Sequence, residues 1–170
     1  YGMRITGGKL RGRIVRGKIR QGVRPTAARV REALFSIIGQ QLDGVAGLDA
    51  FGGSGLLTFE AWSRGATVTT VERNRAAARE INDSANALGV VLDLRIDDVR
   101  NVVSEGEWDV VKMDPPYADD PVEWVATGLV AAKEALVIEH RVGAQMPTQI
   151  GDFVQDRSRR YGDSALTVFR

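Results

Sequence analysis

Runs of residues typical of β-strands alternate with segments typical of α-helices from residue 45 to residue 140. Parallel strands need a crossover connection, usually a helix, so this alternation predicts a mostly parallel sheet covered by helices on both faces. Residues 152–170 predict two further, antiparallel strands joined near Tyr161, Gly162 and Asp163. The expected fold class is α/β. The expected strands are residues 45–51, 66–72, 90–98, 108–114 and 134–140; the expected helices are 54–65, 74–89 and 121–132, with a short turn or helix at 99–106.

The N-terminal segment predicts an arm that stands apart from this pattern. Short β-type runs at residues 4–6 and 13–16 are broken by glycines, as in a hairpin. An exposed loop follows, and Thr26 is expected to cap a helix whose apolar residues recur at helical spacing. The expected division is a basic hairpin arm over residues 3–24 and an α/β domain over residues 25–170.

Charge is distributed unevenly along the chain. Residues 1–31 hold ten basic residues and no acidic one, whereas residues 32–170 hold thirteen basic and twenty-two acidic residues, a net charge of −9. A cationic block attracts polyanions because it neutralises phosphates and releases counterions, so nucleic acid is the expected partner; the alternative is a solvated face that only aids solubility. Arg31 is expected at the start or on the open face of the first helix. The residues expected to contact nucleic acid are Arg4, Lys9, Arg11, Arg13, Arg16, Lys18, Arg20, Arg24 and Arg29.

Composition excludes several classes of site. The 170 residues include no cysteine, which rules out disulfides and thiolate metal sites and suits a reducing compartment. No signal-peptide pattern and no long apolar run is present. The single histidine, His140, has no metal-ligand spacing around it, and a structural role is expected. We therefore expect a cytoplasmic monomer that holds no metal and does not enter a membrane.

Carboxylates stand at the ends of four consecutive expected strands. They are Asp49, Glu72, the neighbours Asp97 and Asp98, and Asp114. In an open α/β sheet, ligands bind beyond the carboxyl ends of the strands, near the point where the strand order reverses. A core does not require acidic residues there, so the pattern predicts a ligand site rich in hydrogen-bond acceptors.

A glycine-rich loop, Phe51-Gly52-Gly53-Ser54-Gly55, follows the first of these strands. Glycines let a ligand approach the backbone at a helix N-terminus, although a structural tight turn would also use them. The third glycine of the dinucleotide pattern G-x-G-x-x-G is missing, which disfavours an NAD-dependent oxidoreductase. Glu72 stands where a carboxylate accepts hydrogen bonds from ribose hydroxyls. An acidic cradle without a basic residue in the loop suits a cationic, adenosine-containing ligand such as S-adenosylmethionine.

The stretch Asp114-Pro115-Pro116-Tyr117 ends the fourth strand abruptly. Proline has no N–H, so the strand stops and leaves carbonyl acceptors without ladder partners. The Asp114 carboxylate and the Pro115 carbonyl are suited to accept both N–H bonds of an amine and to aim its lone pair at a methyl donor. Tyr117 is suited to stack on a nucleic-acid base, and no general base is needed. The alternative is a simple strand stop with Tyr117 as a packing residue.

With these motifs in place, the chain resembles the Rossmann-like class I methyltransferases that depend on S-adenosylmethionine. Within them it looks like the bacterial family that methylates N2 of a guanine in 16S ribosomal RNA. The matching stretches are RITGGKLRGR, RPTAARVREALFSI, LDAFGGSGLLTFEAWSRGA, VER, DPPY and YGDSALTVF. DPPY also marks amino-methyltransferases that act on adenine or on a glutamine amide, so the arm and RPTAARVREALFSI decide the family.

The resemblance implies S-adenosylmethionine as cofactor and 16S rRNA or the small ribosomal subunit as partner. It implies that Glu72 holds the ribose and that Asp98 meets the adenine amino group, while Asp49 lies on the methionine and sugar side. The basic residues of the arm would contact RNA. The expected cofactor-binding residues are Asp49, Phe51, Gly53, Gly55, Glu72, Arg73, Asp98, Val99 and Asp114, and the expected catalytic residues are Asp114, Pro115, Pro116 and Tyr117.

The chain departs from the family pattern around the expected cofactor site. Gly52 takes the position of an alanine, and Asp97 stands where the family often has glycine. Thr58, Phe59 and Trp62 are bulkier than the usual residues of the helix after the glycine loop. Two other functions stay open: an amino-methyltransferase for DNA adenine or protein glutamine, and a non-catalytic RNA-binding protein.

Overall fold

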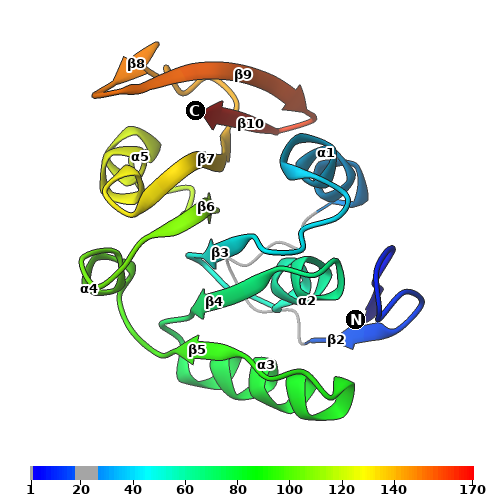
Figure 1. Ribbon diagram of the computed structural model, residues 1–170. Coiled ribbons are helices and arrows are strands. Elements are labelled where there is room, and N and C mark those ends of the chain that lie inside the picture. The colour runs from blue at the N-terminus through cyan, green and yellow to red at the C-terminus, as the bar shows by residue number, and fades with distance from the viewer. Residues whose placement is uncertain (1, 18–26) are drawn as a thin grey trace.

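The computed structural model describes residues 2–17 and 27–170 (Figure 1). Within this part of the chain, the main sheet has eight strands in the order β5-β4-β3-β6-β7-β10-β9-β8, and β1 and β2 form a separate hairpin. The helices are α1 (Ala28–Ile38), α2 (Leu56–Ser63), α3 (Arg75–Leu88), α4 (Val99–Val103) and α5 (Pro121–Leu129). The strands are β1 (Gly2–Arg4), β2 (Ile14–Arg16), β3 (Ala46–Asp49), β4 (Thr67–Val71), β5 (Asp93–Arg95), β6 (Trp108–Met113), β7 (Ala132–Arg141), β8 (Gln149–Ile150), β9 (Phe153–Tyr161) and β10 (Ser164–Phe169).

The topology confirms the expected α/β class. Strands β5, β4, β3, β6 and β7 pair in parallel, whereas β10, β9 and β8 pair antiparallel at the far edge. The strand order reverses between β3 and β6, which are neighbours although β4 and β5 separate them in the chain. Several strands are shorter than expected; β5 covers only three residues of the run 90–98. None of the helices in the described residues is long and apolar enough to cross a membrane.

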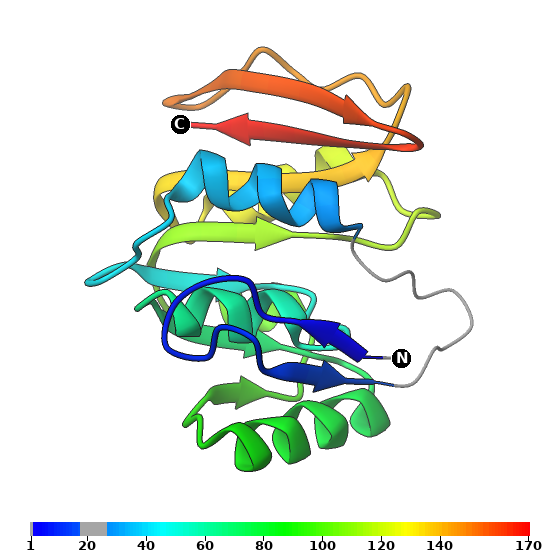
Figure 2. The ribbon, with the colours of Figure 1, turned by 90° about the vertical axis from the view of Figure 1, so that its right-hand side faces the viewer.

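Helices cover both faces of the sheet. Helices α1, α2 and α3 lie on one side, and α4 and α5 lie on the other (Figures 1 and 2). The second side is an apolar core to which α4 contributes Val102 and α5 contributes Val125, packed on Val111, Leu136 and Ile138 of the sheet. Buried apolar residues on the central strands are what a parallel sheet between two helix layers requires.

Side-chain caps begin three of the helices. The side chain of Asn74 accepts from the Ala77 N–H at the start of α3, and Asp98 and Asp120 cap α4 and α5 in the same way. The expectation that Thr26 caps α1 is wrong: the cap position is Ala27, which offers no side-chain hydrogen bond, and Thr26 itself lies outside the described residues. The N-terminal turn of α1 is held by tertiary contacts instead of a local cap.

The N-terminal hairpin docks on the C-terminal end of α2 (Figure 2). The Lys9 N–H donates to the Ser63 carbonyl over 2.8 Å, and the Leu10 N–H donates to the Ser63 hydroxyl over 2.8 Å. Gly8 has a φ of 76°, and a β-carbon there would lie 1.8 Å from the Ser63 carbonyl oxygen. Only glycine permits this approach, so the hairpin is part of the body and not a free arm. The expected boundary at residue 24 falls outside the described residues and stays a prediction.

Glu60 of α2 links its own helix to the N-terminal hairpin and to α1. Its fully buried carboxylate accepts from the Thr6 N–H and hydroxyl at 2.9 and 2.8 Å and from the Gly7 N–H at 3.2 Å. It also pairs with Arg64 at 3.1 Å and lies 3.9 Å from the guanidinium of Arg31 on α1. Arg31 lies in the first turn of its helix, as predicted, but the alternative of an open face is wrong, because the helix turns Arg31 inward toward this carboxylate, where it is 8% exposed.

Replacing Glu60 by glutamine should destabilise the fold. The variant leaves the buried Arg31 without a counter-charge, and removing one partner of a buried ion pair costs about 3–5 kcal/mol. Urea unfolding of Glu60→Gln against the exposed control Glu32→Gln on α1 measures this loss, and the control should stay within about 0.5 kcal/mol of the parent. An equally stable Glu60→Gln protein would mean that the negative charge of Glu60 does not contribute to stability.

Candidate active site

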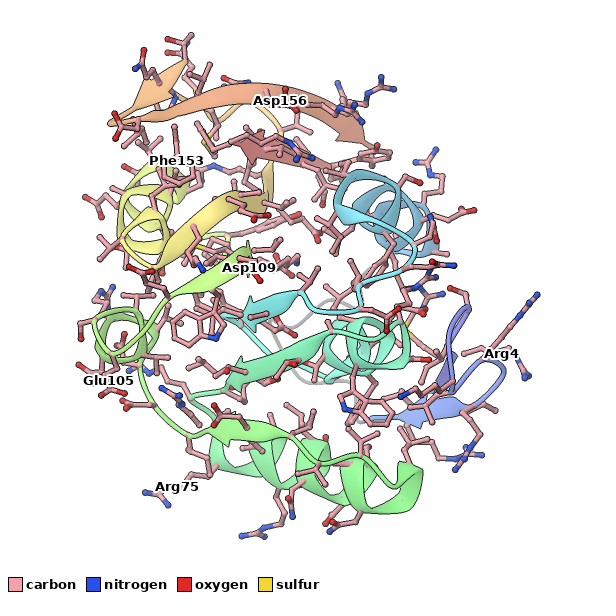
Figure 3. All side chains as sticks on the ribbon, in the orientation of Figure 1. Arg4, Arg75, Glu105, Asp109, Phe153 and Asp156 are labelled. Carbon is pink, nitrogen blue, oxygen red and sulfur yellow. The ribbon has the colours of Figure 1, made fainter. Side chains whose placement is uncertain are left out.

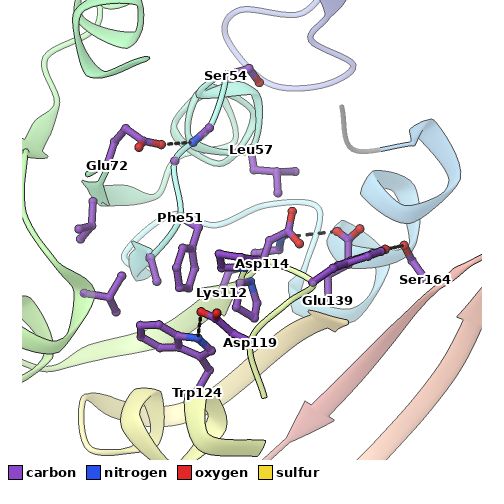
Figure 4. Close-up of a pocket in the computed structure, with 18 of the residues that line it drawn as sticks. Phe51, Ser54, Leu57, Glu72, Lys112, Asp114, Asp119, Trp124, Glu139 and Ser164 are labelled. Carbon is purple, nitrogen blue, oxygen red and sulfur yellow. Dashed lines mark hydrogen bonds and ion pairs between the residues drawn. The ribbon is translucent and has the colours of Figure 1, made fainter. Parts of the chain in front are cut away.

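A cleft of about 990 Å³ opens at the carboxyl ends of the parallel strands, where the strand order reverses (Figure 4). Residues from all four expected strand ends and from α1 contribute to its wall. Asp49 and Gly55 are not among the lining residues and lie behind the wall. The expected residues that line it are Arg29, Phe51, Gly53, Glu72, Arg73, Asp98, Val99, Asp114, Pro115, Pro116 and Tyr117.

The glycine loop and Glu72 are joined directly. The Gly53 N–H donates to one oxygen of Glu72 over 2.9 Å, and the Asn74 N–H donates to the other over 2.8 Å. These bonds orient the carboxylate on the cleft wall (Figure 4). Each carboxylate oxygen has two acceptor positions, so both oxygens keep capacity for donors from a ligand.

A buried polar chain explains two departures from the family pattern. The Thr58 hydroxyl lies 2.7 Å from the Asp49 carboxylate and 2.7 Å from the Thr70 hydroxyl of β4. Thr70 also fills the space beside Gly52, where a β-carbon would lie 2.8 Å from the Thr70 methyl group. Glycine at position 52 leaves room for the Thr70 methyl group, and threonine at position 58 contacts the Thr70 hydroxyl. Both departures therefore fit the site to Thr70. Burial raises the pKa of Asp49 to about 6, opposed by the charge of Lys112 and the Thr58 hydrogen bond.

An aromatic pair forms the apolar side of the cleft. The rings of Phe51 and Trp124 meet edge to face at a centroid distance of 5.0 Å. The Trp124 indole N–H donates to Asp119 over 3.0 Å, and the Arg100 guanidinium lies 4.5 Å from the Trp124 ring centroid. Trp124, which was not among the expected site residues, thus also lines the cleft. With Val99 beside it, this slot has the flat, apolar character that an adenine ring requires.

The two aspartates after β5 have different surroundings. Asp98 caps α4 and pairs with Arg100 at 3.1 Å, and Arg73 lies 3.9 Å from the same oxygen. Asp97 accepts from the Asp98 N–H at 2.7 Å and from the Asn101 side chain at 2.9 Å. Asp97 therefore builds the turn into α4, which accounts for an aspartate where the family often has glycine.

Two hydrogen bonds fix the DPPY turn, one at Pro116 and one at Tyr117. The Asp119 N–H donates to the Pro116 carbonyl over 3.0 Å, and the Tyr117 hydroxyl lies 2.7 Å from the hydroxyl of Ser164 on β10. The Tyr117 ring is anchored by this bond, yet the residue is 38% exposed at the cleft mouth. Asp114 is half-buried at the end of β6. The arrangement presents one carboxylate deep in the cleft and one aromatic face near its entrance.

The sequence analysis missed several lining residues, among them Lys112, Glu139 and Ser164. Lys112 is buried in β6, where its ammonium lies 3.7 Å from the Glu139 carboxylate of β7. A lysine within an apolar strand has no sequence pattern around it that would identify Glu139 as its ion-pair partner. Glu139 could have been found, because it stands near the carboxyl end of the fifth expected strand, where the same rule applies as for the first four.

The described basic residues of the hairpin are exposed, although two of them contact the body: Arg13 donates to the Ala87 carbonyl at 3.2 Å, and the Lys9 ammonium lies 5.7 Å from the Trp62 ring centroid. Arg4 extends outward (Figure 3), and its guanidinium donates to the Gly12 carbonyl at 2.9 Å. Lys18, Arg20 and Arg24 lie outside the described residues. Lys9, Arg11, Arg13 and Arg16 are exposed on the hairpin, and the exposed arginines of β9, Arg157, Arg159 and Arg160, form a second basic strip that the sequence analysis missed.

His140 is buried and structural in its contacts. One ring nitrogen lies 2.7 Å from the Thr167 hydroxyl and the other 2.9 Å from the Arg141 carbonyl. Burial lowers its pKa. Within the described residues, no group of three or more histidine, cysteine, aspartate or glutamate side chains is arranged to hold a metal ion.

Comparison with known proteins gives one family. The family model described as "Conserved hypothetical protein 95" matches residues 3–170. The protein named ribosomal RNA small subunit methyltransferase D of Escherichia coli K12 is 29% identical over 177 residues, which cover 99% of this chain and 89% of that protein. The protein of the same name from Haemophilus influenzae is 33% identical over 123 residues, which cover 68% of this chain and 64% of that one.

A solved structure agrees with this assignment. A hypothetical protein of Thermus thermophilus superposes with a TM-score of 0.80 at 31% identity, and the match covers 98% of each chain. The resemblance expected from the sequence is confirmed, and the chain belongs to the family described as conserved hypothetical protein 95.

Proposed function

We propose that this protein, an S-adenosylmethionine-dependent rRNA methyltransferase, transfers its methyl group to the exocyclic N2 of a guanine in 16S ribosomal RNA. The observation that carries the proposal is that Glu72, the glycine loop and the DPPY turn line one cleft. The names of the relatives support ribosomal RNA of the small subunit as the substrate. The reaction would take place in the cytoplasm, where ribosomal subunits occur.

The cleft suits a cationic nucleoside together with a target base. Ligand pockets have volumes of roughly 300–1,000 Å³. The cleft lies at the top of this range, so it has room for both molecules. Glu72 would hold the ribose, the Gly53 loop would lie beside the sugar, and Phe51 and Trp124 would enclose the adenine. When bound, S-adenosylmethionine supplies a methyl group on a positively charged sulfur.

Asp114 and Tyr117 would prepare the target amine. The lone pair of a guanine amino group is delocalised into the ring, so the amine reacts only if it is held and polarised. The Asp114 carboxylate and the Pro115 carbonyl would accept its two N–H bonds and stabilise the positive charge that develops on nitrogen. Tyr117, anchored by Ser164, would stack on the extruded base. No general base is required, because a methylated ammonium loses its proton readily.

The basic hairpin would hold the RNA while the base enters the cleft. Its side chains are exposed, and the hairpin is fixed to α2 by backbone hydrogen bonds. Phosphate contacts of this kind orient a nucleic acid without reading its sequence. The hairpin would therefore supply affinity and register, and the cleft would supply the choice of base.

Cofactor binding should depend on Glu72. Hydrogen bonds to a charged group contribute about 1.5–3 kcal/mol, so Glu72→Gln should weaken S-adenosylmethionine binding by roughly tenfold to a hundredfold. Titration calorimetry measures this, with Glu134→Gln on the exposed part of β7 as a control that binds like the parent. NAD should not bind; binding of NAD in place of S-adenosylmethionine would refute the assignment.

Methyl transfer should depend on Asp114. Removing one stabilising group aimed at the transition state costs roughly a hundredfold to a thousandfold in rate, so Asp114→Ala should lose that much activity toward small subunits while still binding RNA. Nucleoside mass spectrometry of the product should find N2-methylguanosine. Asp152→Ala, in the exposed turn before β9, is the matched control. Full activity of Asp114→Ala, or methylated adenine as the product, contradicts the proposal.

RNA binding should depend on the hairpin cations. Each phosphate contact contributes about 0.7–0.9 to the slope of log affinity against log salt, so Arg11→Ala combined with Arg13→Ala should reduce the slope by about 1.5. Filter binding to 16S rRNA at several salt concentrations measures it. Lys133→Ala, which removes an exposed cation at the amino end of the internal strand β7, should leave the slope unchanged. An unaltered slope in the double variant moves the RNA surface elsewhere.

A further inference from the structure

Glu139 is a buried carboxylate with unused acceptor capacity on the cleft wall. Its side chain is 9% exposed, it lines the cleft, and its Oε1 atom accepts no hydrogen bond within the described residues. A buried acceptor that is left unsatisfied costs about 1–3 kcal/mol, so natural proteins seldom keep one without a use. The terminal torsion of a glutamate is soft, so the carboxylate can turn either oxygen toward a ligand.

Glu139 lies beside the group that would hold the amine. Strands β6 and β7 run in parallel with Met113 opposite Ile138, so Asp114 and Glu139 are the next residues along neighbouring strands. Figure 4 shows Lys112, Asp114 and Glu139 together on one side of the cleft. Two carboxylates on neighbouring strands thus face the same ligand.

Lys112 offsets the charge of Glu139 without satisfying it. The ammonium lies 3.7 Å from Oε1, which is close enough for an ion pair but too long for a hydrogen bond. Burial raises the pKa of Glu139, the charge of Lys112 opposes this shift, and Asp114 adds to it. Lys112 therefore acts as a positioning residue that keeps a carboxylate at this place in the wall.

The edge of guanine matches this pair of acceptors. Guanine carries a donor at N1 next to its N2 amine, whereas adenine carries an acceptor at N1 next to its N6 amine. A carboxylate beside the amine-holding group therefore attracts the guanine edge and repels the adenine edge. Extruded bases are commonly read by hydrogen bonds to this edge.

We propose that Glu139 accepts the N1–H of the target guanine while Asp114 accepts from its N2 amine, so that Glu139 selects guanine over adenine. This inference rests on the proposed function and adds to it a residue that chooses the base. DPPY alone fits any exocyclic amine, and the specificity would come from the neighbouring strand.

The test compares two bases that share the N2 amine. 2-Aminopurine keeps this amine but has an acceptor at N1 and no oxygen at C6. 16S RNA is ligated with guanine or 2-aminopurine at the mapped target position, assembled into small subunits and methylated. Because the analogue also lacks O6, only the change in preference between the parent and a Glu139 variant reports on Glu139. The measured quantity is the ratio of kcat/KM for guanine over 2-aminopurine.

Glu139→Gln is the informative variant, because a glutamine amide can either accept from guanine N1–H or donate to the N1 of the analogue. The parent should prefer guanine by at least roughly a hundredfold, and Glu139→Gln should reduce this ratio by roughly tenfold or more. Glu134→Gln on the same strand should leave it unchanged. Thermal unfolding and binding of S-adenosylhomocysteine establish that each variant is folded.

A second variant covers the case in which Glu139→Gln does not fold. Replacing both partners of a buried ion pair by apolar residues is often neutral for stability, so Lys112→Met with Glu139→Leu should fold and should also lose the preference. A ratio that falls by less than roughly tenfold in a folded variant overturns the role of Glu139 alone. If the parent makes no N2-methylguanosine, the proposed function itself fails, and the inference fails with it.

Discussion

The buried carboxylate of Glu60 holds three parts of the molecule in one arrangement. It accepts from the backbone of the hairpin at Thr6 and Gly7, and it pairs with Arg64 on its own helix and with Arg31 on α1. The glycine loop enters α2, which carries Glu60, and the first residues of α1 line the cleft. One fully buried charge therefore sets the basic hairpin, which is the proposed RNA-binding surface, and the cleft wall relative to each other. A hairpin attached by apolar contacts alone would be free to slide, whereas directional hydrogen bonds fix its register.

Charge differs between the cleft and the N-terminal hairpin. The cleft is dominated by carboxylates at strand ends, with Lys112 as a buried counter-charge between Asp49 and Glu139. Such a wall attracts a sulfonium and amine donors and repels phosphate. The hairpin is cationic and attracts phosphate. Under the proposed function, RNA would be drawn to the surface beside the cleft, and only a base, which carries no charge, would enter the acidic space.

The sequence predicted the fold and the strand-end residues because both follow from local rules. Alternating runs give strands and helices, and the carboxyl ends of parallel strands converge at one edge. The contact between Glu60 and Arg31 could not be predicted from the sequence. Helical periodicity shows which residues share the buried face of a helix, but it does not show which residue of another helix that face contacts. The link between Gly52 and Thr58 was equally hidden. Both residues accommodate Thr70, and no local pattern connects three positions on a loop, a helix and a strand.

Lys112 marks the limit of the strand-end rule. It lies inside an apolar strand, where a charge is expected to be excluded, and it is stabilised there by the carboxylates of Asp49 and Glu139, the second of which β7 brings within 3.7 Å. Glu139 is in turn kept near Asp114 by the parallel register of β6 and β7. The pair shows why the chemistry and the choice of base can be separated. In the proposed roles, β6 ends in the turn that would hold the amine, and the strand beside it carries the acceptor that would distinguish one amine-bearing base from another.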